Sequence, residues 1–226
     1  MIYKLKIFLR FLKFLLTHPR SLRYVGIWMK YKFFHRGNDF ISAELPWMNF
    51  EVIRWLQSYL TRDMTLFEWG SGGSTLFYAK LVKQVISIEY DKAYFDFVKQ
   101  QLQGRENVQL VLAPPEKTGE FKSFAPQHLG SYFDQYVKTI DQYPDGTFDV
   151  IVVDGRQRNE CFKRALNKIN PEGIIVFDNF EREIYQKSQH HPGISHFMVE
   201  GLVPFNYAIG STAIFYFENR GKKISR

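Results

Sequence analysis

The sequence contains one cysteine, Cys161, among 226 residues. A single thiol cannot form an intramolecular disulfide, and it cannot supply the several thiolates of a typical structural zinc site. This cysteine usage fits a reducing compartment, and we expect a cytoplasmic protein. The chain also lacks internal repeats and low-complexity tracts, and 17% of its residues are aromatic. Such a composition argues against a disordered chain.

Acidic residues are absent from the first 38 positions, which hold nine Lys or Arg. The remaining chain has 21 basic residues against 23 acidic ones, so its formal charge is −2 although the whole chain carries +7. We therefore divide the sequence into a basic aromatic helical arm, residues 1–38, and one domain, residues 39–226. A near-neutral domain offers no electrostatic reason to bind nucleic acid.

The arm also lacks a long uninterrupted hydrophobic run. Residues 2–16 read IYKLKIFLRFLKFLL, which is too short and too charged to span a bilayer, since spanning takes about 20 apolar residues. At helical spacing Lys6, Arg10 and Lys13 share one stripe among Ile, Leu and Phe, and Pro19 should end the helix. This pattern favours an amphipathic helix lying on an anionic membrane.

Packing of the arm on its own domain, or across a dimer, is the alternative. Nucleic acid is a poor third choice, because phosphate-binding surfaces rarely place so many large apolar residues between their basic ones. The expected localisation is thus cytoplasmic, and peripheral at the inner face of the membrane if the membrane interpretation holds. The oligomeric state is open.

Beyond the arm, short apolar runs alternate with helical spacing. The runs that predict strands are 64–69, 85–89, 108–113, 148–154 and 173–177, with two late ones at 197–203 and 213–217. This alternation indicates an α/β fold with a Rossmann-like, doubly wound, mostly parallel sheet and helices on both faces. An insertion at about 114–147 separates the third and fourth runs, and we expect it to carry a helix and to help shape a substrate pocket.

A glycine loop follows the first run, in the segment LFEWGSGGST at 66–75. Its glycines permit a tight turn and close approach of a ligand to the backbone, and Ser74 or Thr75 can cap the next helix. Glu89 stands at the end of the second run, where a carboxylate can bind both ribose hydroxyls of a nucleoside. Glu68 precedes the first glycine; its charge is unfavourable for a pyrophosphate and favourable for an ammonium or sulfonium group.

The segment 68–72 matches the acid-x-Gly-x-Gly motif of class I S-adenosylmethionine-dependent methyltransferases, and the chain resembles that family from about 51 to 217. The resemblance implies S-adenosylmethionine as cofactor. It implies that the loop holds the methionine moiety, with Glu68 near the amino group, Glu89 on the ribose and Tyr90 against the adenine. The loop residues concerned are Gly70, Ser71, Gly72 and Gly73.

Polar residues also end the fourth and fifth runs: Asp154 and the pair Asp178 and Asn179. The ends of parallel strands meet at one edge of the sheet, so these oxygen ligands could converge on Mg²⁺ or Ca²⁺. The arrangement resembles the catechol O-methyltransferase-like branch of the family. That branch has a Lys base three residues after the first Asp, and this sequence has Gln157 there.

The base is therefore open. Asp154 can itself act as base without a metal, or with Arg156 and Arg158 it can bind an acidic or sugar-like substrate. Further candidates follow the fifth run: Arg182 and Tyr185 as substrate contacts, and His191 as a proton acceptor.

These residues predict methylation of an oxygen on a small-molecule or sugar-containing (glycan) acceptor. The alternatives are a nucleotide- or NAD-binding Rossmann oxidoreductase and a catalytically inert membrane-associated binding module.

Overall fold

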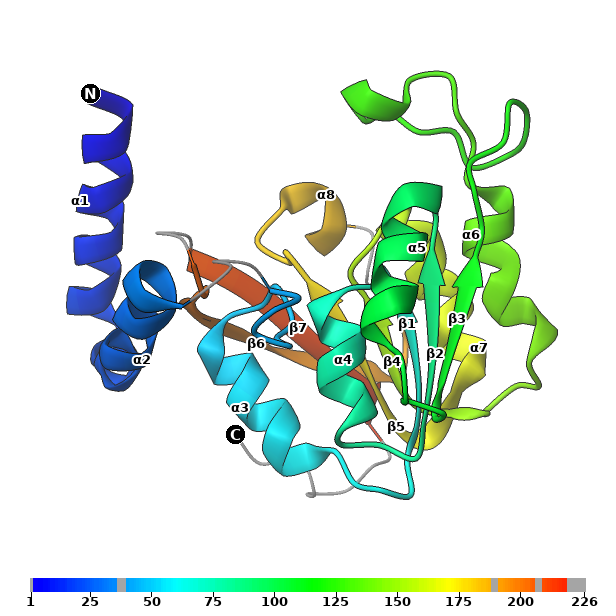
Figure 1. Cartoon of the computed structure of the whole chain (residues 1–226), viewed down its shortest axis with the longest axis horizontal. Coiled ribbons are helices and arrows are strands. Elements are labelled where there is room, and N and C mark those ends of the chain that lie inside the picture. The colour runs from blue at the N-terminus through cyan, green and yellow to red at the C-terminus, as the bar shows by residue number, and fades with distance from the viewer. Residues whose placement is uncertain (1, 36–39, 188–190, 206–208, 219–226) are drawn as a thin grey trace.

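The structure is a computed structural model that describes residues 2–35, 40–187, 191–205 and 209–218. Its centre is a seven-stranded sheet of order β3-β2-β1-β4-β5-β7-β6, with helices packed around it (Figure 1). The strands are β1 Thr65–Trp69, β2 Gln84–Glu89, β3 Val108–Leu112, β4 Phe148–Val153, β5 Ile169–Asp178, β6 Ile194–Leu202 and β7 Ile209–Phe217. All seven predicted strands are present, so the mostly parallel, doubly wound sheet is confirmed.

Strand direction changes only at β7 within the described sheet. β1 to β5 pair in parallel, whereas β7 pairs antiparallel with both β5 and β6. β5 begins earlier than its apolar run, because Ile169 already pairs with Phe148 before the register shifts. The last strand of the chain is therefore inserted between two earlier ones.

Helices cover both faces of the sheet. One face packs α3 Phe50–Tyr59, α4 Gly73–Ala79 and α5 Lys92–Gln101, and the other packs α6 Asp134–Lys138 and α7 Arg158–Lys168. Neighbouring strand residues alternate between the two cores: Leu66 faces α3 and α4, whereas Phe67 lies in the core under α6 and α7. Continuous apolar runs such as that of β4 are explained by this burial on both sides.

The insertion contains α6 and two short 3-10 turns, Pro126–His128 and Thr139–Gln142. Its loop is fastened by the Asp134 carboxylate, which accepts backbone N–H bonds from Glu120 and Phe121 at 2.9 and 3.0 Å. The insertion thus carries a helix as predicted. A further short helix, α8 Glu183–Gln186, follows β5.

The arm forms α1 Ile2–Thr17, a 3-10 turn Pro19–Tyr24, α2 Val25–Met29 and a π-helical turn Lys30–Phe34. α1 ends just before Pro19, as predicted. The arm lies at the end of the molecule opposite β3, and α1 stands outermost (Figure 1). The expected boundary at 38–39 lies outside the described residues, so the division into arm and domain stays a prediction.

Candidate active site

Three acids face the same side of the sheet at its carboxyl edge. Glu68 lies on β1, Asp154 directly follows β4, and Asp178 ends β5. These three strands are neighbours, and the residues two positions earlier on each pack in the core below α3 and α4. Side chains alternate along a strand, so the acids project toward α3 and α4, and each of the two aspartates has a pKa raised in part by the charge of a neighbouring acid.

The glycine loop makes close backbone contacts at two positions. Gly70 has φ +102, and a Cβ on it would lie 3.0 Å from the carbonyl oxygen of Asp154. A Cβ on Gly73 would collide with the carbonyl oxygens of Phe40 and Leu45. Gly73 is therefore required for the passage of segment 40–45 over the start of α4. Contact of these glycines with a cofactor stays a prediction.

Glu68 is buried below the loop and is held by the first turn of α4. Its carboxylate accepts hydrogen bonds from the Ser74 hydroxyl at 2.8 Å and the Thr75 hydroxyl at 2.5 Å. Thr75 Oγ1 also accepts the Gly72 N–H at 3.0 Å, which confirms a capping role for Thr75. The pKa of Glu68 is raised to about 7, mainly by burial. The hydroxyls bonded to it oppose this shift, and the charge of Glu89 adds to it.

Glu89 and Ser71 are brought together although 18 residues separate them. Ser71 Oγ donates to Glu89 Oε2 at 2.8 Å, while Oε1 accepts the N–H groups of Tyr90 and Asp91, each at 2.8 Å. Burial raises the pKa of Glu89, and these hydrogen bonds oppose the shift. The carboxylate is thus fixed beside the glycine loop. Binding of the ribose hydroxyls, the role predicted for Glu89, requires a carboxylate beside the loop.

Tyr90 lies in an aromatic cluster with part of the insertion. Its ring has edge-to-face contacts with His128 and Phe133, at centroid distances of 5.3 and 5.5 Å. Arg156 Nη2 donates to the Tyr90 hydroxyl at 3.0 Å, and its guanidinium lies 5.1 Å from the ring centroid. Arg156 is therefore placed with Tyr90, on the side of the site where the nucleoside is predicted.

Arg158 links Asp154 and Asp178. Its Nη2 is 2.9 Å from Asp154 Oδ1 and its Nη1 is 3.9 Å from Asp178 Oδ2. Burial raises the pKa of both carboxyls. Each is also affected by a neighbouring acid, Glu68 for Asp154 and Asp154 for Asp178, while the guanidinium lowers both values. The two acids hold less than their full negative charge near neutral pH as a result.

Asp178 has two further partners. Thr212 Oγ1 and Asn179 Nδ2 each donate to its carboxylate at 2.7 Å, and Asn179 has φ +58. The structure thus gathers the predicted metal ligands Asp154, Asp178 and Asn179. They do not fit a divalent ion as arranged, because Arg158 already supplies the positive charge and Asn179 turns its amide N–H toward Asp178. A metal role for them stays a prediction.

Two buried tyrosine hydroxyls at the site were not predicted from the sequence. The hydroxyls of Tyr78 and Tyr136 are both buried without a hydrogen-bond partner in the described part of the chain. Burial raises the pKa of Tyr78, and the charges of Glu68, Asp154 and Asp178 add to the effect. Tyr136 abuts Gly155, where a Cβ would collide with its hydroxyl. Unsatisfied buried hydroxyls beside acids are polar groups that a ligand can use.

The other side chains predicted to act on the substrate lie in different places. Tyr185 packs on Phe177, and the guanidinium carbons of Arg158 and Arg182 lie 5.8 and 5.9 Å from its ring centroid. Arg182 itself is exposed. His191 is half-buried, and its ring centroid lies 5.6 Å from that of Phe162, a residue of the core under α6 and α7. The structure therefore places Tyr185 beside Arg158, the basic partner of the acid pair, and proton transfer by His191 stays a prediction.

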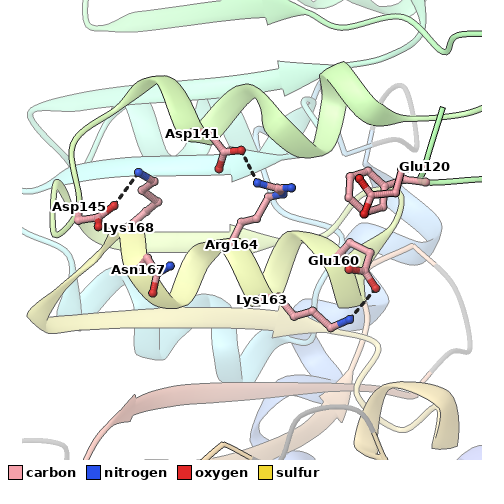
Figure 2. Close-up of a pocket in the computed structure, with 9 residues that line it drawn as sticks. Glu120, Asp141, Asp145, Glu160, Lys163, Arg164, Asn167 and Lys168 are labelled. Carbon is pink, nitrogen blue, oxygen red and sulfur yellow. Dashed lines mark hydrogen bonds and ion pairs between the residues drawn. The ribbon is translucent and has the colours of Figure 1, made fainter.

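A surface pocket of about 320 Å³ lies elsewhere, between α7 and the insertion (Figure 2). Its charged side chains pair with one another: Lys168 with Asp145 at 2.6 Å, Lys163 with Glu160 at 2.8 Å, and Arg164 with Asp141. It contains none of the predicted site residues. We therefore regard the carboxyl edge of the sheet as the candidate site.

Three solved structures match this architecture. A methyltransferase-like protein from Silicibacter pomeroyi is 23% identical, with 73% of this chain and 84% of that chain covered and a TM-score of 0.51. An O-methyltransferase from Bacillus cereus, in complex with S-adenosylhomocysteine, is 19% identical, with 71% and 77% covered and a TM-score of 0.50. An rRNA methylase from Streptococcus thermophilus is 15% identical, with 73% and 93% covered and a TM-score of 0.51.

The chain has the class I methyltransferase fold. Dinucleotide-binding sheets have the order 3-2-1-4-5-6, whereas this sheet inserts the antiparallel β7 between β5 and β6. No protein-family model matches the sequence, and no curated protein matches it. The class I methyltransferase fold is thus evident in the structure, and the catechol O-methyltransferase-like detail stays a prediction.

Proposed function

We propose that this protein is an S-adenosylmethionine-dependent methyltransferase that methylates an oxygen of a small-molecule or sugar-containing acceptor. The observation that carries the proposal is the charge of the site. Glu68, Glu89 and Asp178 are buried at one edge of the sheet together with Asp154, and Arg158 is their basic partner. Burial raises the pKa of all four acids. A ligand that brings positive charge removes this penalty.

S-adenosylmethionine suits the site, because its ammonium and sulfonium groups are positively charged. A pyrophosphate suits it poorly. Glu68 lies directly below the start of α4, bonded to Ser74 and Thr75, and its carboxylate would oppose an anion bound there. The position of Glu68 and the sheet order therefore both favour the methyltransferase over the NAD-dependent alternative.

The proposed residue roles follow from the contacts. Glu68 would receive the ammonium group, and Glu89, oriented by Ser71 and two backbone N–H groups, would bind the ribose hydroxyls. Tyr90 would border the adenine. Bound S-adenosylmethionine supplies an activated methyl group for transfer to a nucleophile. The protein's part is alignment and removal of a proton.

We assign proton removal to the pair of Asp154 and Asp178. A carboxyl whose pKa is raised toward neutrality is a better proton acceptor than one with an ordinary value. Arg158 fixes the pair by its contact with Asp154 at 2.9 Å, and Thr212 orients Asp178. In this assignment the acceptor's hydroxyl proton passes to the ionised member of the pair. The acceptor would be contacted by Tyr185, the half-buried Arg156 and the exposed Arg182.

Calorimetric titration with S-adenosylhomocysteine tests the cofactor. We expect wild type to bind, and Glu89→Ala to bind roughly 10- to 100-fold more weakly, since charged hydrogen bonds contribute about 1.5–3 kcal/mol. Gly72→Asp should abolish binding. Glu106→Ala, which removes an exposed acid, is the matched control. Absence of wild-type binding, or binding of NAD in its place, would overturn the proposal.

The acceptor requires a separate screen. Candidate phenols, sugars and glycans should be incubated with the enzyme and a methyl-labelled donor, with Asp154→Asn as the inactive comparison. Labelled O-methyl product that depends on Asp154 supports the assignment. Label found only on nitrogen would contradict the oxygen specificity while leaving methyl transfer in place. An inert binding module would bind cofactor or nothing and label no acceptor.

A further inference from the structure

The arm packs on its own domain through aromatic contacts. Tyr24 stacks on Phe50 of α3 at a ring distance of 5.9 Å, and within the arm Phe11 and Trp28 are buried against each other at 4.8 Å. Polar contacts reinforce the packing: Ser21 Oγ donates to Glu51 at 2.6 Å. The arm therefore does pack on the domain, and its orientation is fixed.

The opposite side of α1 presents leucines to solvent. Leu9, Leu12 and Leu16 are 54%, 40% and 84% exposed. Their spacing of three and four residues aligns them on one stripe of the helix. Phe11 and Phe14, which are buried, lie on the other side. α1 is thus apolar on both sides, and the side with Phe11 and Phe14 is covered, in part by Trp28 and His18 of the arm itself.

The apolar exposure continues along the rest of the arm. The exposed large hydrophobic residues beyond α1 are Leu22, Ile27, Met29, Phe33 and Phe34, and Phe34 reaches 79%. So much exposed apolar surface in one segment marks an interaction site on a water-soluble domain. α1 stands outermost in the molecule, so this surface is accessible (Figure 1).

Basic residues border the same surface. Arg10, Lys13 and Arg20 are exposed, as are Arg23 and Lys30, and the first 38 residues contain no acid. On α1, Arg10 and Lys13 flank the leucine stripe at helical spacing. Leucines beside basic residues, in a segment without acidic residues of its own, complement an anionic lipid surface: the leucine side chains enter the acyl region and the basic side chains meet the headgroups.

We infer that the exposed side of the arm docks the protein on an anionic phospholipid membrane. α1 would lie in the plane of the interface, with Leu9, Leu12 and Leu16 inserted. Among the described residues, no helix combines the length and apolar character that a bilayer crossing requires. The fixed packing of the arm would then hold the whole domain in one orientation on the membrane.

The orientation places the rim of the candidate site near the docked arm. Tyr31 of the arm contacts Phe205 at a ring distance of 5.3 Å, and Phe205 contacts Phe40 at 4.9 Å. The carbonyl oxygen of Phe40 closes over Gly73 at the start of α4. Membrane docking does not depend on the proposed function. That the methyl acceptor lies in the membrane is a further consequence, and it rests on the proposed function.

Vesicle flotation with the full chain tests the inference. We expect binding to vesicles of phosphatidylcholine with phosphatidylglycerol, weak binding to phosphatidylcholine alone, and release by salt. The double variant Arg10→Gln, Lys13→Gln should bind about 30-fold more weakly, because each basic residue near such a surface raises the affinity about fivefold. Leu9→Ser with Leu16→Ser should weaken it at least tenfold.

Matched controls use exposed residues outside the arm. Phe124→Ser with Leu129→Ser removes two exposed hydrophobic side chains, and Lys83→Gln with Lys117→Gln removes two exposed charges. Both should float as wild type does. Unchanged flotation of the arm variants would overturn the inference, as would wild-type binding to an oligonucleotide or self-association in place of vesicle binding. Binding of S-adenosylhomocysteine by the same variants separates this result from the fate of the proposed function.

Discussion

Arg158 Nη2 lies 2.9 Å from Asp154 Oδ1, and the same guanidinium donates to the backbone carbonyl oxygen of Asp178. One side chain from the start of α7 thereby connects the ends of two neighbouring strands, β4 and β5. The connection is almost fully buried, since the Arg158 side chain is 10% exposed. Removing it leaves two buried acids without their basic partner.

We therefore expect Arg158→Gln to lower the free energy of unfolding by about 3–5 kcal/mol, the usual cost of breaking a buried ion pair from one side. Arg164→Gln is the control on the same helix. It breaks the more exposed pair with Asp141 and should cost no more than about 1 kcal/mol. Urea denaturation at pH 7 measures both. Equal losses for the two variants would mean that Arg158 has no special part in the site.

Chelation should leave methyl transfer unchanged. Arg158 supplies the positive charge between Asp154 and Asp178, and Asn179 and Thr212 donate to Asp178 at 2.7 Å. The experiment compares initial rates before and after treatment with a chelator, and again after Mg²⁺ or Ca²⁺ is restored. A rate that falls on chelation and returns with Mg²⁺ would show that the arrangement opens to admit an ion.

Cofactor binding should release a proton below neutral pH. The pKa of Glu68 is raised by burial to about 7 in the ligand-free site, and a bound ammonium group would lower it. Affinity should therefore rise with pH up to about 7, by at most tenfold per unit. Titrations with S-adenosylhomocysteine in buffers of different ionisation enthalpy count the released protons. Glu68→Gln should reduce both the release and the pH dependence, and what remains is due to the other site acids, whose pKa values burial also raises.

The same shift has a consequence for stability. An acid whose folded pKa lies above its ordinary value of 4.5 holds its proton more tightly in the folded state. The contribution of Glu68 to the free energy of unfolding of the ligand-free protein should then fall as the pH rises from 4.5 toward about 7. The slope in Glu68→Gln should be shallower over this window. If the two slopes coincide, Glu68 is already ionised throughout.

The sequence predicted the sheet well because β1, β2, β4 and β5 are buried on both faces and read as continuous apolar runs. It also predicted the shared edge of Asp154 and Asp178, since the carboxyl ends of parallel strands meet there, but it did not place Glu68 beside them. Thr212 could not be found in this way. It reaches Asp178 only because β7 inserts beside β5, and such a non-local pairing leaves no local pattern.

The tyrosine hydroxyls were missed for a different reason. Tyr78 follows Phe77 in α4, and Tyr136 lies in an insertion rich in Tyr and Phe, so the pattern predicts core packing for both. Their rings are indeed in the core, and only their unpartnered hydroxyls mark the site. Arg158 pairs directly with Asp154 across a four-residue spacing, which was not predicted from the sequence, and its contact with substrate stays a prediction.

Gly73 provides the last test, because the structure gives it a role that differs from the expected one. A Cβ there would collide with backbone oxygens of Phe40 and Leu45, so segment 40–45 would have to move away from α4. We expect Gly73→Ala to cost about 1–3 kcal/mol of stability and to weaken binding of S-adenosylhomocysteine, since the displaced segment borders the glycine loop.

Gly26→Ala is the matched substitution, in α2, where a Cβ would meet nothing within 4 Å. Alanine is the better helix former, so this variant should gain about 0.5–1 kcal/mol and bind cofactor as wild type does. Denaturation and calorimetry of the two variants distinguish close packing from ligand contact. Wild-type stability with lost binding in Gly73→Ala would assign Gly73 to the cofactor, whereas loss of both assigns it to the packing of segment 40–45.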